Sequence, residues 1–376
     1  METYTLEIIL IAVVAAAACA LPGVFLVLRR SAMLADAISH TVLLGIVLGF
    51  FLTGDLSSPF LVLGAAAVGV LTALLTALLE RTQLVKNDAA VGLIFPALFS
   101  IAIILISRYA GDVHLDTDVV LLGELAFAPF DRFAPFGVDL GPRGLYVMGG
   151  ILLINLAFIG LFYKELKLST FDVGLAAVLG FAPAVVHYML MSLVSITLVG
   201  AFDIVGSVLV VALMVAPAAS AYLLVNRLPA MLALSTGLGA LSALTGYLLA
   251  FLLDASIAGS IATMAGLIFL VSLLFAPEQG VVAQLRRRAR QRWEFAALML
   301  NAHLLNHEGS REAEQENRAS HLTDHLRWSP EFASQVITYA QRSGLIAVEG
   351  DHLRLTPAGR QRTLKHYPSS GTLEGT

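Results

Sequence analysis

Residues 28–52 read "LRRSAMLADAISHTVLLGIVLGFFL", a largely apolar stretch that begins with a pair of arginines. About 20 apolar residues are enough for a helix to cross a membrane. Asp36 and His40 are four residues apart within it, so a helix places them on one face with Ser39 beside them. An Asp at the centre of a membrane helix costs roughly 2.5–3.5 kcal/mol on insertion scales. We therefore expect these side chains to face a helix bundle or a water-filled path.

Similar apolar stretches recur along the first three-quarters of the chain. The 376 residues are 58% hydrophobic and 13% charged, against about 25% charged in soluble domains. Of the charged residues, 27 lie in residues 1–280 and 23 in residues 281–376. The sequence therefore predicts an all-α membrane protein with about nine transmembrane helices. The predicted spans are 6–28, 32–53, 59–79, 88–107, 144–163, 184–202, 204–225, 229–252 and 256–276.

The predicted domains are a transmembrane domain at 1–280, a basic juxtamembrane linker at 281–292 and a soluble domain at 293–376. The N-terminal residues lack a basic region, so we expect no cleaved signal peptide. Cys19 is the single cysteine, which excludes a disulfide framework and a cysteine-based metal cluster.

The loops between the predicted spans fall into two sets of different charge. Lysine and arginine concentrate in one set, which the positive-inside rule places in the cytoplasm. That set holds Arg29, Arg30, Arg81, Lys86, Lys164, Lys167, Arg227 and the run "LRRRARQR" at 285–292. The other set holds Asp55, the acidic stretch 111–124 and Asp254, although the excursion 108–143 also carries three arginines. We expect the N-terminus outside and the C-terminal tail inside.

Asp36 and His40 are the leading candidates for a transient cation site. Carboxylate and imidazole ligands suit manganese, iron or zinc, and other helices would have to complete the shell. The alternative is that Asp36 pairs with Arg29 or Arg30 at the helix end. Asp203 and His187 are weaker candidates for the same path: Asp203 stands at a turn or a broken helix, or is an ordinary loop acid, and a lone histidine such as His187 is more often structural.

A second group of candidates lies in the predicted external loop "GDVHLDTDVVLLGE" at 111–124. Acidic and histidine side chains there could collect divalent cations by raising their local concentration. The alternative is a solvated loop with no binding role. The residues concerned are His114, Asp116, Asp118 and Glu124.

Five stretches together resemble the permeases of ABC transporters for manganese, zinc and iron. The resemblance runs through about residues 5–280, in order and at the expected spacing. The stretches are "LRRSAMLADAISHTVLLGIVLGFFL" (28–52), "GDVHLDTDVVLLGEL" (111–125), "KELKLSTFDVGLAAVLGF" (164–181), "GAFDIVGSVLVVALMVAPAASAYLL" (200–224) and "LDASIAGSIATMAGLIFLVSLLF" (253–275).

This resemblance implies a permease in the bacterial inner membrane that imports a divalent metal, most similar to the manganese branch, with zinc or iron also possible. It implies a homodimer or heterodimer of permeases, a cytoplasmic ATPase subunit and an external solute-binding protein. Asp36 and His40 match the D-x-x-S/A-H pattern whose acid and histidine line the path in such permeases. Asp203 stands where manganese-type members commonly have an acidic residue, often Glu. The metal is cargo, and no permanently bound cofactor is expected.

The resemblance also assigns residues 168–182 to the helix that couples to the ATPase. The residues expected to make this contact are Ser169, Thr170, Phe171, Asp172, Gly174 and Leu175. In "STFD" at 169–172, Ser169 or Thr170 could cap a helix start. The chain has no G-x-x-x-x-G-K-[ST] motif, so ATP must be hydrolysed by another chain and the permease is not an enzyme. The alternative class is a secondary transporter driven by an ion gradient, in which Asp36 and His40 would relay protons.

The tail is predicted to fold as a helix at 292–307, a short helix at 318–326, a helix from Ser329 and Pro330 to about 343, a hairpin within 344–359 and a helix at 357–366. This order resembles the winged-helix domain of metal-dependent repressors. Three roles stay open: a contact module for the ATPase or a second permease, which we favour, a metal sensor, and DNA binding. DNA binding ranks last because 331–343 carries Arg342 as its single basic residue. The sensor would use histidines spaced for metal ligation, namely His303, His307, His321 and His325.

Overall fold

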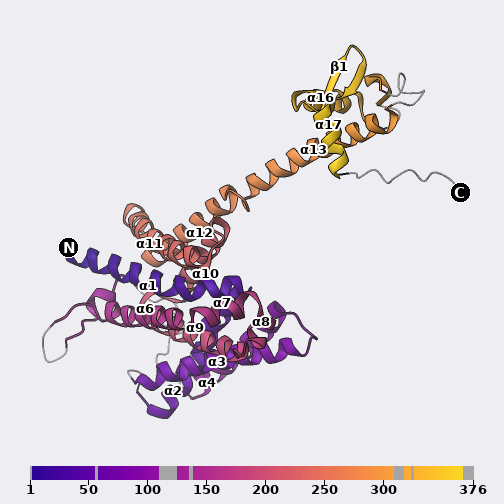
Figure 1. Cartoon of the computed structure of the whole chain (residues 1–376). Coiled ribbons are helices and arrows are strands. Elements are labelled where there is room, and N and C mark those ends of the chain that lie inside the picture. The colour runs from indigo at the N-terminus through magenta and orange to yellow at the C-terminus, as the bar shows by residue number, and fades with distance from the viewer. Residues whose placement is uncertain are drawn as a thin grey trace. The chain divides into compact units, whose positions relative to one another are not determined.

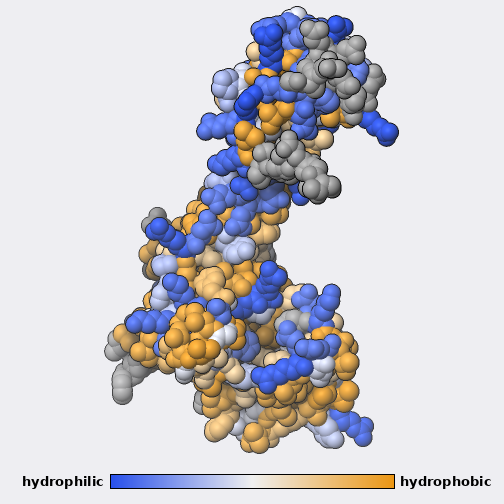
Figure 2. All heavy atoms as spheres, turned by 45° about the vertical axis from the view of Figure 1, so that its right-hand side comes forward, coloured by the Kyte–Doolittle hydropathy of each residue, from blue (hydrophilic) through white to orange (hydrophobic). Residues whose placement is uncertain are grey.

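The computed structural model describes residues 2–55, 58–109, 125–134, 139–308, 317–322 and 326–366. The chain divides into two compact units, residues 1–280 and residues 281–376, here called the membrane unit and the tail unit (Figure 1). In Figure 2 the visible face of the membrane unit is mostly hydrophobic, whereas the tail unit is mostly hydrophilic. The surface of the membrane unit therefore suits contact with lipid, and the surface of the tail unit suits contact with water.

Within the described residues, nine helices are long and apolar enough to cross a membrane, which confirms the predicted number. They are α1 (Glu2–Leu28), α2 (Ala32–Thr53), α3 (Pro59–Arg81), α4 (Asn87–Tyr109), α6 (Arg143–Leu161), α9 (Pro183–Val205), α10 (Ser207–Leu224), α11 (Leu228–Leu253) and α12 (Ile257–Phe275). Between α6 and α9 the chain forms two short helices, α7 (Tyr163–Phe171) and α8 (Val173–Val178). A 3-10 turn, η1 (Ala128–Phe130), precedes α6.

Helix α1 lies at the centre of the membrane unit and contacts α6, α9, α10 and α11. Its alanine-rich middle is buried, because small side chains let neighbouring helices approach closely. Asn155 of α6 donates through Nδ2 to the backbone oxygen of Ala18 (2.8 Å) and to Oγ1 of Thr197 on α9 (3.1 Å). These bonds satisfy a buried amide that lipid could not satisfy and join three helices.

Helices α2 and α3 pack backbone against backbone through glycines. A Cβ atom added at Gly45 would lie 2.3 Å from the backbone oxygen of Gly64, so neither position has room for a side chain. Nearby, the buried hydroxyls of Thr41 and Thr72 lie 2.7 Å apart. The helix that carries Asp36 and His40 is therefore held tightly along α3.

The described residues of the tail unit form α13 (Val281–His307), η3 (Ala319–His321), α16 (Pro330–Arg342), β1 (Ile346–Glu349), β2 (His352–Leu355) and α17 (Pro357–His366). The strands pair antiparallel with Ile346 opposite Leu355, and Gly350 turns the hairpin at φ 65°. A small core, which includes Leu300, Val336 and Leu353, joins α13, α16 and β2.

Several details of the tail differ from the prediction. The basic run 285–292, predicted as a linker, is helical and forms part of α13. Of the predicted short helix 318–326, the described residues show the 3-10 turn η3, while 323–325 lie outside them. The hairpin and the helix that begins with Ser329 as its cap form as expected. A winged-helix fold is not evident from these elements.

Candidate metal path and coupling segment

Asp36 and His40 lie on one face of α2, in its first turns. The His40 Nε2 atom is 3.7 Å from Oδ1 of Asp36. The imidazole packs on α4, with its centroid 5.2 Å from that of Phe95 and 6.0 Å from that of Phe99. The side chain of Asp36 is 57% exposed and that of His40 is 32% exposed. The pair is thus held on one side by aromatic rings and open on the other.

The open side of Asp36 borders a groove of about 370 Å³ between α2, α10 and α12. Its lining residues are Ala32, Met33, Asp36, Val211, Ala212, Val215, Ala216, Ala219 and Phe269. Asp36 is the one ionisable side chain among them. A carboxylate on this apolar surface is costly against lipid, which favours a groove that faces water or another protein.

Asp203 and His187 lie at opposite ends of α9 and are not brought to Asp36. Asp203 is exposed in the last turn of α9, and Gly206, with φ 81°, is the single residue between α9 and α10. His187 lies in the first turns of α9 and receives a hydrogen bond from Arg29. Among the residues that the structure describes, no three His, Cys, Asp or Glu side chains form a group suited to a metal.

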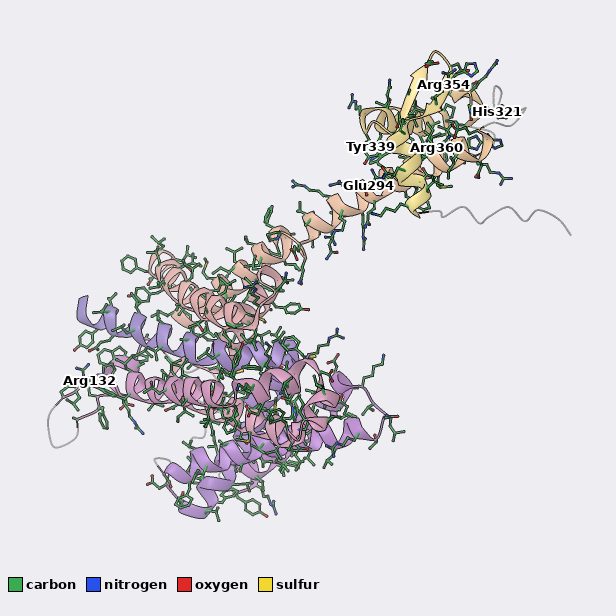
Figure 3. All side chains as sticks on the ribbon, viewed as in Figure 1. Arg132, Glu294, His321, Tyr339, Arg354 and Arg360 are labelled. Atoms are coloured by element: carbon green, nitrogen blue, oxygen red, sulfur yellow. The ribbon has the colours of Figure 1, made fainter. Side chains whose placement is uncertain are left out.

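Five of the predicted site residues lie outside the described residues, and three more are in the tail unit. His114, Asp116, Asp118 and Glu124 of the external loop, and His325 of the tail, are outside the described residues. In the tail unit, the rings of His303 and His307 have their centroids 4.7 Å apart on α13, and His321 is in η3. Both His321 and Arg360 are labelled in the tail unit in Figure 3. Arg360 forms an ion pair with Glu308.

The coupling segment, defined as α7 and α8 (residues 163–178), has its cap at Asp172. Asp172 Oδ1 accepts a hydrogen bond from the backbone N–H of Leu175 (2.8 Å) at the start of α8. The prediction that Ser169 or Thr170 caps a helix is wrong, because both lie inside the last turn of α7. Gly174 is exposed beside the cap. The segment and the residue that follows it carry large exposed apolar side chains, namely Phe171, Val173, Leu175, Val178 and Leu179.

Arg29, just beyond the end of α1, forms hydrogen bonds to the end of α7 and to α9. It donates through Nη2 to Oγ of Ser169 (2.8 Å), through Nε to Oγ1 of Thr170 (3.1 Å) and through Nη1 to Nδ1 of His187 (3.2 Å). Burial lowers the pKa of Arg29 to about 10, so the side chain stays protonated at neutral pH. These contacts show that Arg29 does not neutralise Asp36. The sequence presents Arg29 as a topology signal and as a possible partner of Asp36, and it gives no sign of the bonds to Ser169, Thr170 and His187.

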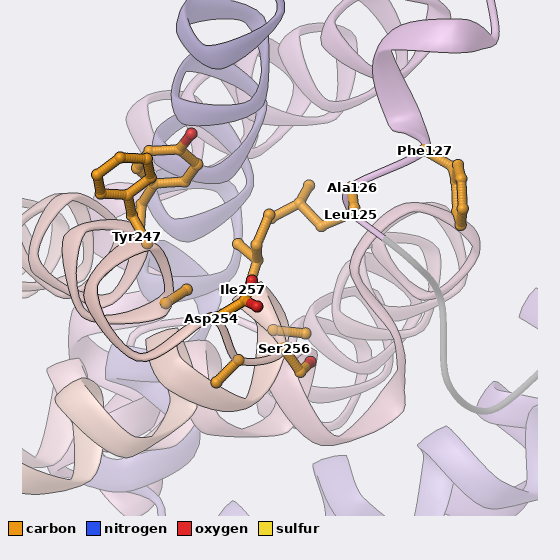
Figure 4. A pocket seen from close by; sticks show the side chains of 11 residues that line it. Leu125, Ala126, Phe127, Tyr247, Asp254, Ser256 and Ile257 are labelled. Atoms are coloured by element: carbon orange, nitrogen blue, oxygen red, sulfur yellow. The ribbon is translucent and has the colours of Figure 1, made fainter.

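At the Asp254 end of the membrane unit, a pocket of about 640 Å³ lies between residues 125–127 and the turn from α11 to α12. Figure 4 shows Tyr247, Asp254 and Ser256 around it. Asp254 ends α11 in the left-handed conformation, with φ 49°. Arg132 (Figure 3), a few residues after the 125–127 wall of this pocket, pairs with Glu7 (2.9 Å) and Asp139 (2.8 Å). Hydrogen bonds to these two carboxylates raise the pKa of Arg132. These contacts tie the segment before α6 to the start of α1.

Within the described residues, the membrane unit has nine helices able to span a membrane, and one of them carries an acid and a histidine. The sequence has no G-x-x-x-x-G-K-[ST] motif, as expected of a transport permease that depends on a separate ATPase. Residues 1–276 match the family described as the ABC 3 transport family, and the chain belongs to this family. It is therefore a permease subunit of an ABC transporter and not an enzyme, with ATP hydrolysed by a separate subunit. This membership decides against the alternative of a gradient-driven carrier.

The chain is similar to proteins named for zinc and manganese transport. It is 48% identical over 355 residues to the zinc transport system membrane protein TroD of Treponema pallidum, covering 94% of this chain and 96% of that protein. It is 45% identical over 289 residues to the manganese transport system membrane protein MntD of Bacillus subtilis, covering 77% of this chain and 98% of that protein. Among solved structures, it matches PsaBC from Streptococcus pneumoniae in complex with Fab, with a TM-score of 0.61, 29% identity, and 73% and 93% of the two chains covered.

Proposed function

We propose that this permease imports a divalent transition metal, with manganese first and zinc or iron as the other candidates. Asp36 and His40 bind the ion transiently on its way through the membrane. The observation that carries this proposal is the exposed Asp36 carboxylate on an apolar helix surface, 3.7 Å from the His40 imidazole. Oxygen and nitrogen ligands suit these metals, and relatives are named for manganese and zinc transport.

Two ligands from one helix leave the coordination shell of the ion incomplete. The groove beside Asp36 therefore faces a second permease, identical or related, and the path runs between the two copies. A second copy would bring an equivalent acid and histidine to the same place. This arrangement also removes the Asp36 carboxylate from lipid, which is the physical requirement that its exposure creates.

The orientation follows from the loop charges. The end of the membrane unit that holds Arg29 and the coupling segment faces the cytoplasm, and the tail unit lies on the same side of the bacterial inner membrane. The ATPase docks on the exposed apolar side chains of the coupling segment, including Phe171 and Leu175. The external solute-binding protein delivers metal at the Asp254 end, where Asp203 and the acidic loop 111–124 attract cations. His187 belongs with Arg29 rather than with the path.

The tail unit adds a function that the transport core does not need. MntD of Bacillus subtilis is 98% covered by a 289-residue match, which leaves that protein almost no length for a counterpart of residues 281–376. We therefore propose that the tail, a winged-helix-like domain, regulates the permease in response to internal metal through histidines such as His303 and His307. This reverses the order expected from the sequence, in which the contact module ranked first, because MntD has almost no length for such a module; an assembly module that holds the ATPase or a second permease is the alternative.

The test of the metal path is uptake of manganese and zinc by the chain co-expressed with its ATPase and solute-binding protein. Asp36→Asn and His40→Ala each remove one ligand without changing helix length, so both should abolish uptake while membrane insertion stays intact. Asp88→Asn, which removes an exposed acid from the first turn of α4, is the matched control and should transport normally. Full uptake by both path variants would refute the site.

A further inference from the structure

The connection between α1 and α2 is short and rigid. Only residues 29–31 separate the two helices, and Arg30 takes the left-handed conformation with φ 57°. The backbone N–H of Arg29 donates to Phe25 (3.0 Å) and that of Ser31 to Leu26 (2.9 Å). Asp36 follows in the first turns of α2. A displacement of Arg29 therefore reaches the helix that carries Asp36 with no flexible segment between them.

The guanidinium of Arg29 reaches two elements far away in the sequence. Its bonds to Ser169 and Thr170 hold the last turn of α7, and its bond to His187 holds the start of α9. Because arginine only donates, His187 Nδ1 must accept, which places the histidine proton on Nε2. All three partners are neutral, so the contacts are directional hydrogen bonds whose strength depends on alignment. They fix the position of the coupling segment relative to the α1–α2 turn.

We propose that Arg29 is a positioning residue that transmits movement of the coupling segment to α2, and so links the ATPase cycle to the accessibility of Asp36 and His40. This inference rests on the proposed function. When the docked ATPase shifts α7 and α8, the bonded Arg29 moves with them and tilts the start of α2. Without these bonds, the coupling segment can still bind the ATPase through its exposed face, but its movement no longer reaches the ion site.

The experiment compares Arg29→Lys and Arg29→Ala with wild type in the complete complex with ATPase and solute-binding protein, using Mn²⁺ as the probe. Lysine keeps the charge but cannot hold three separate partners in one plane. We expect both variants to purify with wild-type amounts of ATPase and to transport about tenfold less Mn²⁺ per ATP hydrolysed, since several charge-assisted bonds are lost. Arg30→Asn is the matched control, because it removes the neighbouring exposed charge and asparagine tolerates the left-handed backbone.

A second variant tests the same link from the other side. Replacing Ser169 by alanine and Thr170 by valine together removes two acceptors while Arg29 remains, and it should lower Mn²⁺ uptake per ATP in the same way. Normal uptake per ATP in the Arg29 variants would overturn the inference. Loss of the ATPase from their complexes would also overturn it, since Arg29 would then only support assembly. Absence of Mn²⁺ uptake by wild type would instead refute the proposed function.

Discussion

Replacing Gly45 by alanine would force α2 away from α3. The added Cβ would lie 2.3 Å from the Gly64 oxygen and 2.5 Å from the Ala65 Cα, whereas ordinary contacts of this kind begin at 3.4 Å, so the two backbones must separate by about 1 Å. Overpacking of this kind costs about 1–3 kcal/mol. Alanine recovers about 1 kcal/mol of helix propensity, which leaves a net loss of up to about 2 kcal/mol.

The same displacement should disturb transport, because α2 carries the candidate ion site and His40 packs on Phe95 of α4. We expect a lower midpoint of thermal denaturation in detergent and reduced metal uptake in cells. Gly150→Ala on α6 is the matched control, since nothing lies within 4 Å of a Cβ at that position. It should be as stable as wild type or slightly more stable. If Gly45→Ala matched wild type in both assays, the proposed close packing of α2 on α3 would be refuted.

Three other changes probe the coupling segment and the tail. Leu175→Glu or Gly174→Trp on the exposed surface of α8 should uncouple ATP hydrolysis from metal uptake, and unchanged uptake per ATP would place the ATPase contact elsewhere. Deletion of 293–376 should preserve uptake and remove its inhibition by high internal metal; a fall in uptake at every metal concentration would instead indicate an assembly role. Within the tail of the full-length protein, Leu300→Ala should cost about 2–5 kcal/mol and Ser329→Ala, which removes a helix cap, about 1 kcal/mol. Limited proteolysis would compare the stability of the two variants, and Leu300→Ala should be cleaved faster than Ser329→Ala. Equal resistance would contradict the assignment of Leu300 to the core of the tail unit.

The membrane helices could be predicted from sequence because each is a local property of about 20 apolar residues. The shared face of Asp36 and His40 was equally local, since helix geometry fixes neighbours at i and i+4. The bonds of Arg29 could not be predicted, because Ser169 is 140 residues away and hydrophobic periodicity carries no information on which polar side chains meet. The cap at Asp172 was missed because Ser169 and Thr170 have the same capping preference, and tertiary contacts decide among them.

The exposed carboxylate beside the α2–α10–α12 groove also bears on how cells handle this subunit before it assembles. A newly inserted single copy presents the Asp36 carboxylate on a surface that would otherwise face lipid; a charge at the centre of a membrane helix costs roughly 2.5–3.5 kcal/mol, and Asp36, in the first turns of α2, carries a part of that cost. Such a cost favours pairing over the same surface with an apolar residue, by at most on the order of a hundredfold if the full helix-centre cost applied. An orphan copy would therefore be a distinguishable, short-lived species in the membrane. Protease surveillance could remove it, and the abundance of the permease would then follow that of its partner.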